Sequence, residues 1–353
     1  MNLDDLSSIK QLDSQNMLGE IEKLPAQLEK AWKLGQTQPL PEITGIRQII
    51  ISGMGGSAIG ADLLAAYITP SCPVPVSVHR DYGLPAWAQG PETLFIASSH
   101  SGNTEETLEA FNVAFHNKCQ LIAVATGGKL AGFAMQAKIP LWKFEHRGQP
   151  RAAVGFSFGL LLAVFTRLGY IPDPVKELVG AVAAMKKQQE TLRADVPVTR
   201  NPAKRLAGQL VGRWVNVYGS GCLAPVARRW KGQINEIAKA GAGFEILPEA
   251  DHNALAGLLN PADILSDTMT LFLRAPSNHP RTRLRTDLTR REFMVEGLNT
   301  DVYEAQGETP LAHIWTTLHF GDYTAYYLAM AYGADPTPVE ALENLKAAIQ
   351  AAL

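Results

Sequence analysis

The chain has 353 residues, of which 46% are hydrophobic, and its formal net charge is −2. This length suits two domains or one large α/β unit, and the near-neutral charge excludes a general electrostatic attraction to nucleic acids or anionic membranes. The three cysteines are far apart and form no metal or disulfide pattern, and no apolar run reaches the roughly 18 residues of a membrane span. The acidic N-terminus lacks a signal-peptide core, so we expect a cytoplasmic protein.

Apolar residues recur at helical spacing near the N-terminus, which predicts an amphipathic helix over about residues 16–34. These residues are Leu18, Ile21, Leu24, Leu28 and Trp32. Residues 1–44 are therefore expected to form an N-terminal helical segment that packs on the first sheet or on a partner subunit.

Short apolar strand patterns alternate with helical patterns over residues 45–196. The predicted strands cover residues 47–51, 74–78, 93–97, 120–125 and 140–144, and the predicted helices include 61–68, 152–168 and 172–195. Such alternation is typical of a parallel sheet covered by helices on both faces. Ligands of these sheets bind at the carboxyl ends of the strands.

The alternation begins again after a hinge predicted near residues 195–202. Strands are predicted at 213–218, 243–247, 264–273 and 302–303, with helices at 223–239, 281–297, 310–332 and 338–351. We therefore predict an α/β fold with two domains of the same kind, residues 45–196 and 197–353. The arginine-rich stretch at 274–291 is interrupted by acidic residues, which favours a solvated helix or a subunit contact over a nucleic-acid surface.

The turn at residues 98–104, Ser-Ser-His-Ser-Gly-Asn-Thr, joins an apolar strand to a predicted helix. Free amides at the start of a helix, several hydroxyls and a glycine together favour a binding site for an anion such as phosphate. An ordinary polar turn, with Asn103 or Thr104 as the helix cap, is the alternative interpretation.

A second glycine-rich turn, Gly53-Met54-Gly55-Gly56-Ser57-Ala58, also lies between a strand and a helix. It matches the loose dinucleotide pattern, but the next strand ends in Val78-His79-Arg80 and lacks the acidic residue that would bind the ribose. The turn could also be purely structural and serve only close packing. A further alternative is that Gly55, Gly56 and Ser57 face the turn at 98–104, so that both turns contact one small anion.

Several motifs follow one another in a specific order. They are Gly53-Met54-Gly55-Gly56-Ser57, Ser99-x-Ser101-Gly102-Asn103-Thr104, Pro150-Arg151-Ala152-Ala153, the segment Arg229 to Glu236, His252-Asn253, and the ending Gly333 to Glu340. Together they resemble the bifunctional phosphoglucose/phosphomannose isomerases, which contain two sugar isomerase (SIS) domains. The resemblance runs from about Ile49 to Lys346.

This resemblance implies an isomerase that interconverts aldose and ketose 6-phosphates as a homodimer, and we expect no metal and no cofactor. The residues that would bind the phosphate are Gly55, Gly56, Ser57, Ser99, Ser101 and Thr104. Arg151 would be the active-site arginine and Glu236 the catalytic base. His252 would reach the site from the neighbouring subunit and help to open the sugar ring. Lys346 would be its partner in ring opening, although Lys231 or Lys239 could take that role.

The residue types fit this chemistry. Moving a carbonyl group between C1 and C2 needs one base, and a carboxylate serves well where burial raises its pKa. A guanidinium stabilises a developing enediolate without losing its proton, and a histidine exchanges protons near neutral pH. From the residues alone, Glu236 could instead be a solvated glutamate, Arg151 a helix-capping arginine and His252 a loop histidine.

Two positions differ from the family pattern. His100 stands where an aromatic residue such as tyrosine is expected, and Ile237 stands where the family often has asparagine. Both leave the preference between glucose and mannose 6-phosphate open. Two rival functions remain, a non-catalytic sugar-phosphate sensor and a dinucleotide-dependent oxidoreductase.

Overall fold

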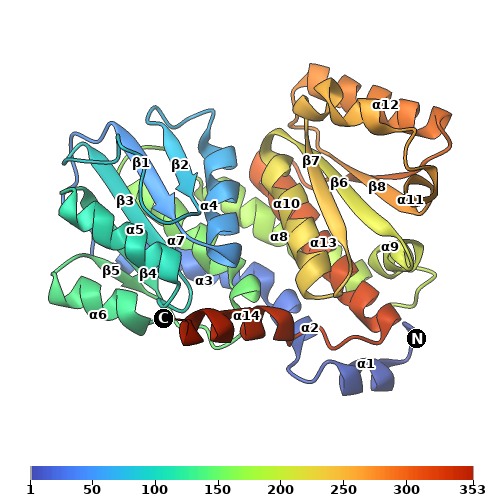
Figure 1. The fold of residues 1–353 in the computed structure, drawn as a ribbon, viewed down its shortest axis with the longest axis horizontal. Coiled ribbons are helices and arrows are strands. Elements are labelled where there is room, and N and C mark those ends of the chain that lie inside the picture. Colours follow the sequence, from blue (N-terminus) through green and yellow to red (C-terminus); the bar gives the residue numbers. More distant parts are fainter. Residues whose placement is uncertain (1, 353) are drawn as a thin grey trace.

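The computed structural model describes residues 2–352 and contains two α/β units that lie side by side (Figure 1). The first unit is built on a five-stranded sheet with the order β2-β1-β3-β4-β5, in which all paired strands are parallel. Its strands are β1 (Gln48–Ser52), β2 (Val76–His79), β3 (Thr93–Ser99), β4 (Gln120–Ala125) and β5 (Leu141–Lys143). The predicted fold class, parallel sheets flanked by helices, is confirmed.

Both faces of the first sheet are buried, which explains why its central strands are continuously apolar. In β1, Ile49 and Ile51 join one core cluster and Ile50 joins another on the opposite face. One face is covered by α4 (Gly55–Ile68) and α7 (Val154–Arg167), and α3 (Leu24–Thr37) packs on α7. The other face is covered by α5 (Glu105–His116) and α6 (Gly128–Gln136).

The second unit contains a four-stranded parallel sheet with the order β7-β6-β8-β9. Its strands are β6 (Trp214–Ser220), β7 (Ala242–Leu247), β8 (Thr268–Arg274) and β9 (Asn299–Glu304). The inner face packs on α10 (Ala224–Glu236) and α13 (Pro310–Tyr332), and the outer face packs on α12 (Pro280–Val295). Nearly every residue of α13 is buried, so this helix is the centre of the second unit.

The two units share one hydrophobic core rather than touching only at their surfaces. Residues of α4, α7, α10 and α13 belong to the same buried cluster, and α8 (Val175–Leu192) packs along α13. The helices α4 and α10 are in contact across the junction. Consequently the N-terminal end of α4 and the C-terminal part of α10 can contribute to one site.

The structure differs from the predicted elements at several places. The helix predicted from residue 61 begins already at Gly55, so Gly55, Gly56 and Ser57 form the first turn of α4. The predicted strand 264–273 is wrong at its start, because α11 (Ala262–Ser266) follows Pro261 and the strand begins only at Thr268. The single helix predicted over 16–34 is two helices, α2 (Met17–Glu22) and α3, separated by Lys23.

Two further helices were not anticipated. One is α1 (Leu6–Leu12), and the other is α9 (Pro202–Leu210), which lies just after the predicted hinge. Asn201 accepts hydrogen bonds from the amides of Ala203 and Lys204. Proline suits the first position of a helix and asparagine suits the cap. The pair Asn201-Pro202 therefore starts a helix, at a place where the sequence analysis predicts a hinge.

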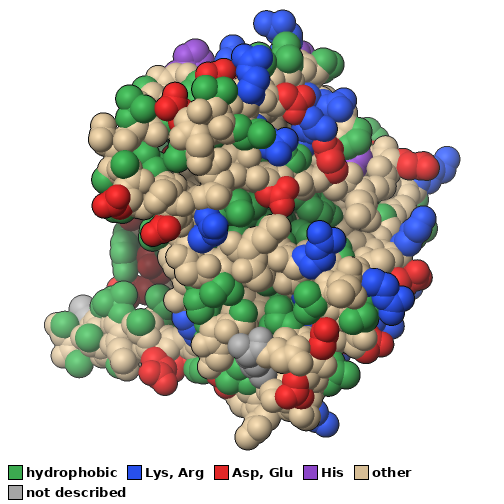
Figure 2. Space-filling model, turned by 90° about the vertical axis from the view of Figure 1, so that its right-hand side faces the viewer, with side chains coloured by type: hydrophobic (Ala, Val, Ile, Leu, Met, Phe, Trp, Pro, Cys, Tyr) green, Lys and Arg blue, Asp and Glu red, His purple; other side chains and the backbone are tan. Residues whose placement is uncertain are grey.

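The remaining elements are short or lie at the C-terminus. They are the 3-10 helices η1 (Pro150–Ala152), η2 (Gly221–Leu223), η3 (Glu249–His252) and η4 (Ala254–Gly257), and the terminal helix α14 (Glu340–Ala351). Within residues 2–352 no helix is both long and apolar enough to cross a lipid bilayer. Figure 2 shows Lys and Arg side chains on the upper part of the molecule, where α12 lies, interspersed with Asp and Glu. Two ion pairs in this region join Arg274 to Asp287 and to Glu304.

Candidate active site

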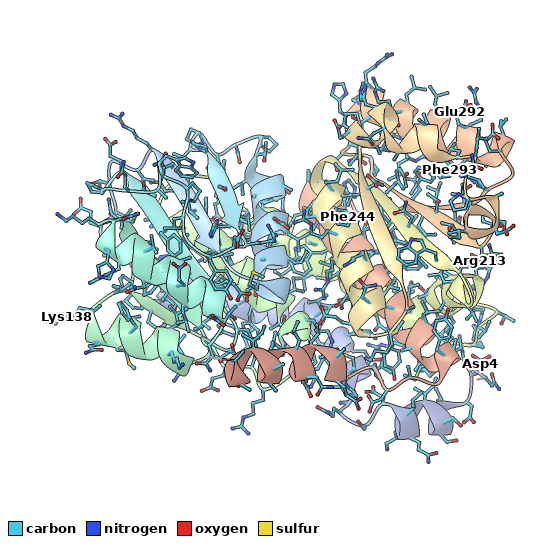
Figure 3. All side chains as sticks on the ribbon, in the orientation of Figure 1. Asp4, Lys138, Arg213, Phe244, Glu292 and Phe293 are labelled. Carbon is cyan, nitrogen blue, oxygen red and sulfur yellow. The ribbon has the colours of Figure 1, made fainter. Side chains whose placement is uncertain are left out.

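A cleft of about 420 Å³ lies between the two units. Its walls come from the start of α4, from the turn η1, from α10 and from Phe244 of β7, which lies on the side of the second unit that faces the first (Figure 3). The lining residues are Gly55, Gly56, Ile59, Arg80, Arg151, Arg228, Arg229, Lys231, Gly232, Gln233, Glu236 and Phe244. The cleft therefore brings together the predicted residues Gly55, Gly56, Arg151 and Glu236.

The two polar turns of the first unit are joined by hydrogen bonds. The amide of His100 donates to Ser57 Oγ at 3.2 Å, the amide of Gly102 donates to Ser99 Oγ at 3.1 Å, and Ser99 Oγ lies 3.1 Å from Thr104 Oγ1. Three of the predicted phosphate-binding hydroxyls thus belong to one cluster at the carboxyl ends of β1 and β3. We call the turns 53–57 and 98–104 the hydroxyl cradle. The fourth residue, Ser101, is exposed on its rim.

Two glycines allow the backbone segments around the cradle to pack closely. Gly102 adopts a φ of +66°, and a side chain there would collide with the carbonyl oxygen of Gly127, in a third turn that the sequence analysis missed. A Cβ on Gly56 would lie 2.5 Å from the carbonyl oxygen of Pro150. The absence of a side chain at Gly56 therefore lets η1, with Arg151, approach the first turn of α4.

Arg151 is held rigidly against Glu236. Its side chain is 4% exposed, and its Nη2 donates to the carbonyl oxygens of Pro336, at 3.1 Å, and of Thr337. Its Nη1 lies 3.6 Å from Glu236 Oε2. Burial lowers the pKa of Arg151 while the charge of Glu236 acts against this shift. A fixed cation and a carboxylate thus face the same space beside the cradle.

Behind this pair lies a buried ionic network. Arg229, on α10, donates from Nε and Nη2 to both carboxylate oxygens of Asp322, at 3.1 and 2.7 Å, and Gln233 donates to the same carboxylate at 3.0 Å. Arg229 Nη2 also donates to the carbonyl oxygen of Arg151 at 3.0 Å. The network fixes the backbone of η1 relative to α10, and so it fixes Arg151 relative to Glu236.

Sequence reasoning missed this network, although a signal was present. Arg229, Gln233 and Glu236 are spaced four and then three residues apart, which places their side chains on one face of a helix. The partner, Asp322, is buried in a helix far along the chain that has no other acidic residue and no Lys or Arg, and a buried aspartate requires a cation nearby.

Positive charge dominates the cleft. Arg80, Arg151, Arg228, Arg229 and Lys231 line it, against the single carboxylate of Glu236. Asp62 lies behind the wall and pairs with Arg80 and, at 3.3 Å, with Arg228. An excess of cations in a partly enclosed cleft favours an anionic ligand.

Of the two lysines considered as alternatives to Lys346, Lys231 lines the cleft and Lys239 lies just beyond the end of α10. Burial, reinforced by the charge of Arg151, lowers the pKa of Lys239 to about 8. Its Nζ donates to the carbonyl oxygen of Glu236 at 2.6 Å, which ties the end of α10 to the following turn.

Of the predicted residues that do not line the cleft, Ser57, Ser99, Ser101 and Thr104 belong to the cradle, whereas His252 and Lys346 belong neither to the cleft nor to the cradle of their own chain. His252 is exposed at the end of η3, which follows β7, and Lys346 is exposed on α14. Within a single chain, the cradle, Arg151 and Glu236 therefore lie together, whereas His252 and Lys346 lie elsewhere.

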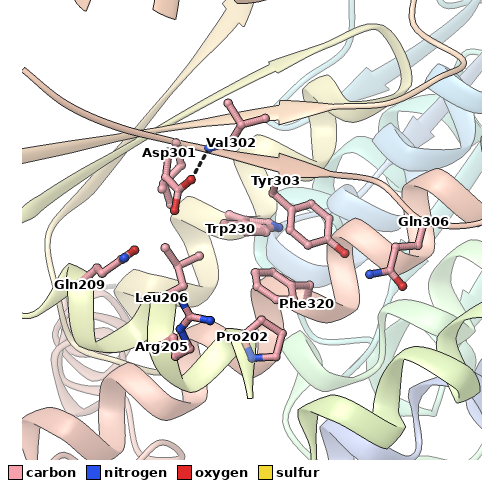
Figure 4. Close-up of a pocket in the computed structure, with 11 residues that line it drawn as sticks. Pro202, Arg205, Leu206, Gln209, Trp230, Asp301, Val302, Tyr303, Gln306 and Phe320 are labelled. Carbon is pink, nitrogen blue, oxygen red and sulfur yellow. Dashed lines mark hydrogen bonds between the residues drawn. The ribbon is translucent and has the colours of Figure 1, made fainter. Parts of the chain in front are cut away.

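Other arrangements in the molecule bear on the alternative functions. The end of β2, where a dinucleotide site needs a carboxylate, carries His79 and Arg80. Within residues 2–352, no three His, Cys, Asp or Glu side chains are grouped so that they could hold a metal ion. A further hollow of about 270 Å³ lies beside the rings of Trp230, Tyr303 and Phe320, and none of the predicted site residues lines it (Figure 4).

The chain is similar to several known proteins. Residues 199–349 match a family model described as the bacterial phospho-glucose isomerase C-terminal SIS domain. The chain is 38% identical to a bifunctional phosphoglucose/phosphomannose isomerase of Caldicellulosiruptor bescii, over 94% of this chain and 98% of that protein. It is 32% identical to the protein of the same name from Aquifex aeolicus, over 86% of this chain and 91% of that one. Its fold resembles that of tagatose-6-phosphate ketose/aldose isomerase from Escherichia coli, with a TM-score of 0.70 and 17% identity over 91% and 94% of the two chains.

Proposed function

The chain belongs to the family of bifunctional phosphoglucose/phosphomannose isomerases and is an isomerase, and from that premise we propose that it interconverts glucose 6-phosphate and mannose 6-phosphate with fructose 6-phosphate. The observation that carries this proposal is the pairing of Arg151 with Glu236 in a cationic cleft beside the hydroxyl cradle.

In this proposal the cradle binds the phosphate. The amides at the start of α4 and the hydroxyls of Ser57, Ser99, Ser101 and Thr104 supply donors to a dianion, and the positive end of the helix dipole adds to them. Gly55 and Gly56 leave the backbone amides accessible. Binding energy gained at the phosphate holds the reacting carbons in place beside the catalytic groups.

Glu236 then acts as the base. Its carboxylate removes the proton from C2 of the open aldose, so that a cis-enediolate forms. The hydroxyl proton on O2 passes to O1, and return of the carbon proton to C1 then gives the ketose. The guanidinium of Arg151 stabilises the negative charge that develops on the enediolate oxygens. Because its two backbone acceptors and the Arg229 network fix it in advance, this stabilisation needs little rearrangement during the reaction.

Ring opening is assigned to His252 and Lys346, with His252 supplied by the second subunit of a homodimer. Asp251, next to His252, accepts hydrogen bonds from Arg285 and Thr289 of α12, which attaches the His252 loop to that helix. Leu284 and Leu288 are 45% and 41% exposed one turn apart on the same helix. Exposed apolar side chains on the helix to which the His252 loop is attached support a subunit contact there.

The terminal helix also supports an assembled form. Its apolar residues Leu342, Leu345 and Ile349 are all exposed, and no residue of α14 is buried. In Figure 2, a segment with hydrophobic side chains projects at the lower left, at the height that α14 has in Figure 1. A neighbouring subunit that covers this face would also order Lys346.

The rival function, a non-catalytic sugar-phosphate sensor, requires the cradle alone. A sensor has no use for a carboxylate beside an anion site, whereas an isomerase needs both a base and a fixed cation there. The pairing of Arg151 with Glu236 therefore favours catalysis.

The direct test is an assay of the purified protein with each of the three sugar phosphates in turn. We expect each aldose phosphate to yield fructose 6-phosphate, and fructose 6-phosphate to yield both aldose phosphates. We also expect the rate to be unchanged after extensive treatment with a chelator. A protein that binds the sugar phosphates but converts none of them would support the sensor instead.

A further inference from the structure

A hydrogen-bonded chain of three ionisable side chains ends inside the hydroxyl cradle. His100 lies between Ser99 and Ser101, and its Nε2 is 2.9 Å from Nδ1 of His146. Nε2 of His146 is in turn 3.0 Å from Glu20 Oε2. The chain joins three separate segments: α2, the loop after β5, and the turn at 98–104.

The carboxylate at one end determines where the protons sit. A carboxylate only accepts, so His146 Nε2 carries a proton and its neutral Nδ1 accepts from Nε2 of His100. His100 Nδ1 is then an unprotonated acceptor. This atom has no hydrogen-bond partner among residues 2–352, and it is not enclosed by them. A proton-accepting nitrogen is therefore accessible in the turn that carries two of the cradle serines.

Aromatic rings pack around the hydrogen-bonded chain, and the Lys30 ammonium lies 5.8 Å from the centre of one of them, the Phe156 ring. His146 is 8% exposed, and rings of Phe144 and Phe156 pack beside the two histidines. Lys23, between α2 and α3, pairs with the other oxygen of Glu20 at 3.3 Å, but its side chain is 65% exposed, so solvent weakens its effect. Glu20 is thus the charge that faces the histidines directly.

We propose that Glu20, His146 and His100 couple proton uptake to anion binding, so that the cradle takes up one proton when a phosphate-type dianion enters it. This inference rests on the proposed placement of the phosphate in the cradle. In this role His100 is a positioning residue whose ring gains a proton, and with it a positive charge, when the anion binds. The carboxylate of Glu20, at the other end of the hydrogen-bonded series, compensates for that positive charge.

The direction of the coupling follows from the state of the empty cradle. Burial, together with the neighbouring His146, lowers the pKa of His100 to about 4, so the empty chain carries no extra proton at neutral pH. A bound dianion stabilises the protonated form and raises that pKa. By linkage, anion affinity then rises as the pH falls from the pKa of the complex toward the pKa of the empty cradle.

Sulfate is the appropriate probe, because it stays a dianion over the range in which phosphate esters titrate. We suggest measuring its dissociation constant by calorimetry between pH 7.5 and 5.5, in two buffers with different ionisation enthalpies, which reports proton uptake directly. Lys239, with a pKa of about 8, is about three-quarters protonated at pH 7.5 and almost fully protonated below pH 7, so its contribution to the slope is confined to the upper end of the range. For the wild-type protein we expect binding to tighten about tenfold, since one coupled proton permits at most about tenfold per pH unit.

Two variants on different segments test the assignment. His100→Tyr keeps an aromatic ring and a donor toward His146 but does not titrate in this range, so its affinity should vary less than about twofold with pH. Glu20→Gln keeps the shape of the side chain but removes its charge, so the tightening should move about one pH unit or more toward acid. His116→Gln, on the exposed end of α5, is the matched control and should behave as the wild type.

The outcomes separate this inference from the proposed function. A wild-type affinity for sulfate that does not change with pH would overturn the coupling, and so would full retention of the pH dependence in His100→Tyr. Isomerase activity is measured separately, and its absence would count against the proposed function without affecting the sulfate result. Thermal unfolding of each variant shows that the comparison is between folded proteins.

Discussion

Replacing Glu236 by glutamine is expected to lower kcat by about 10²- to 10⁴-fold, the range typical for loss of a general base. KM should change little, because the cradle, the proposed phosphate site, is left intact. Glutamine has the size and shape of glutamate but cannot take up a proton at neutral pH. Its amide can still lie beside Arg151, which is anchored independently by the carbonyl oxygens of Pro336 and Thr337.

The measurement is steady-state kinetics with fructose 6-phosphate at saturating concentration. Glu190→Gln is a suitable control, since Glu190 is an exposed helical glutamate on α8 and should have wild-type kinetics after the same substitution. Undiminished kcat in Glu236→Gln would remove the proposed base. A rise in KM with unchanged kcat would instead assign Glu236 to binding.

The second prediction concerns which subunit supplies His252 to each active site. If the two subunits share each site, mixing Glu236→Gln with His252→Ala should restore activity that neither variant has alone. In the mixed dimer one site collects both substitutions, whereas the other has its own Glu236 and the partner's intact histidine. Random association of equal amounts should therefore recover about a quarter of the wild-type activity.

This complementation experiment needs subunits that exchange, so the two variants are mixed after mild dissociation or produced together in one cell. Mixing each variant with itself provides the baseline. If the mixture stays as inactive as its components, although mixed dimers are shown to form, then His252 does not act across the interface. In that case His252 would have to move from its exposed position to reach the cleft of its own chain.

The sequence predicted the architecture well because its signals are local. The run 49–51 is apolar and β-branched, Gly53 and Gly56 after it are required by close packing, and a similar strand and glycine turn follow Trp214. Local patterns also predicted the hydroxyl turns, and parallel strands necessarily bring their carboxyl ends to one edge of the sheet. The proximity of Ser57 to Ser99 follows from this rule.

Other features depend on contacts that local patterns do not encode. Arg229 is fixed by Asp322, and His100 is joined to Glu20 through His146. In both cases the partners are far apart in sequence and come together only through the packing of the helices. The start of α4 at Gly55 was missed for a related reason. Glycine has a low helix propensity, and the close contact with η1 overrides it.

The most direct test of the central claim is a crystal structure of the Glu236→Gln variant with fructose 6-phosphate bound. We predict the phosphate on the hydroxyls of Ser57, Ser99 and Thr104, and C1 and C2 of the open sugar within about 3–3.5 Å of the side chain of residue 236, the separation of a reactive arrangement. Phosphate density outside the cradle, or C1 and C2 beyond the reach of residue 236, would contradict the account.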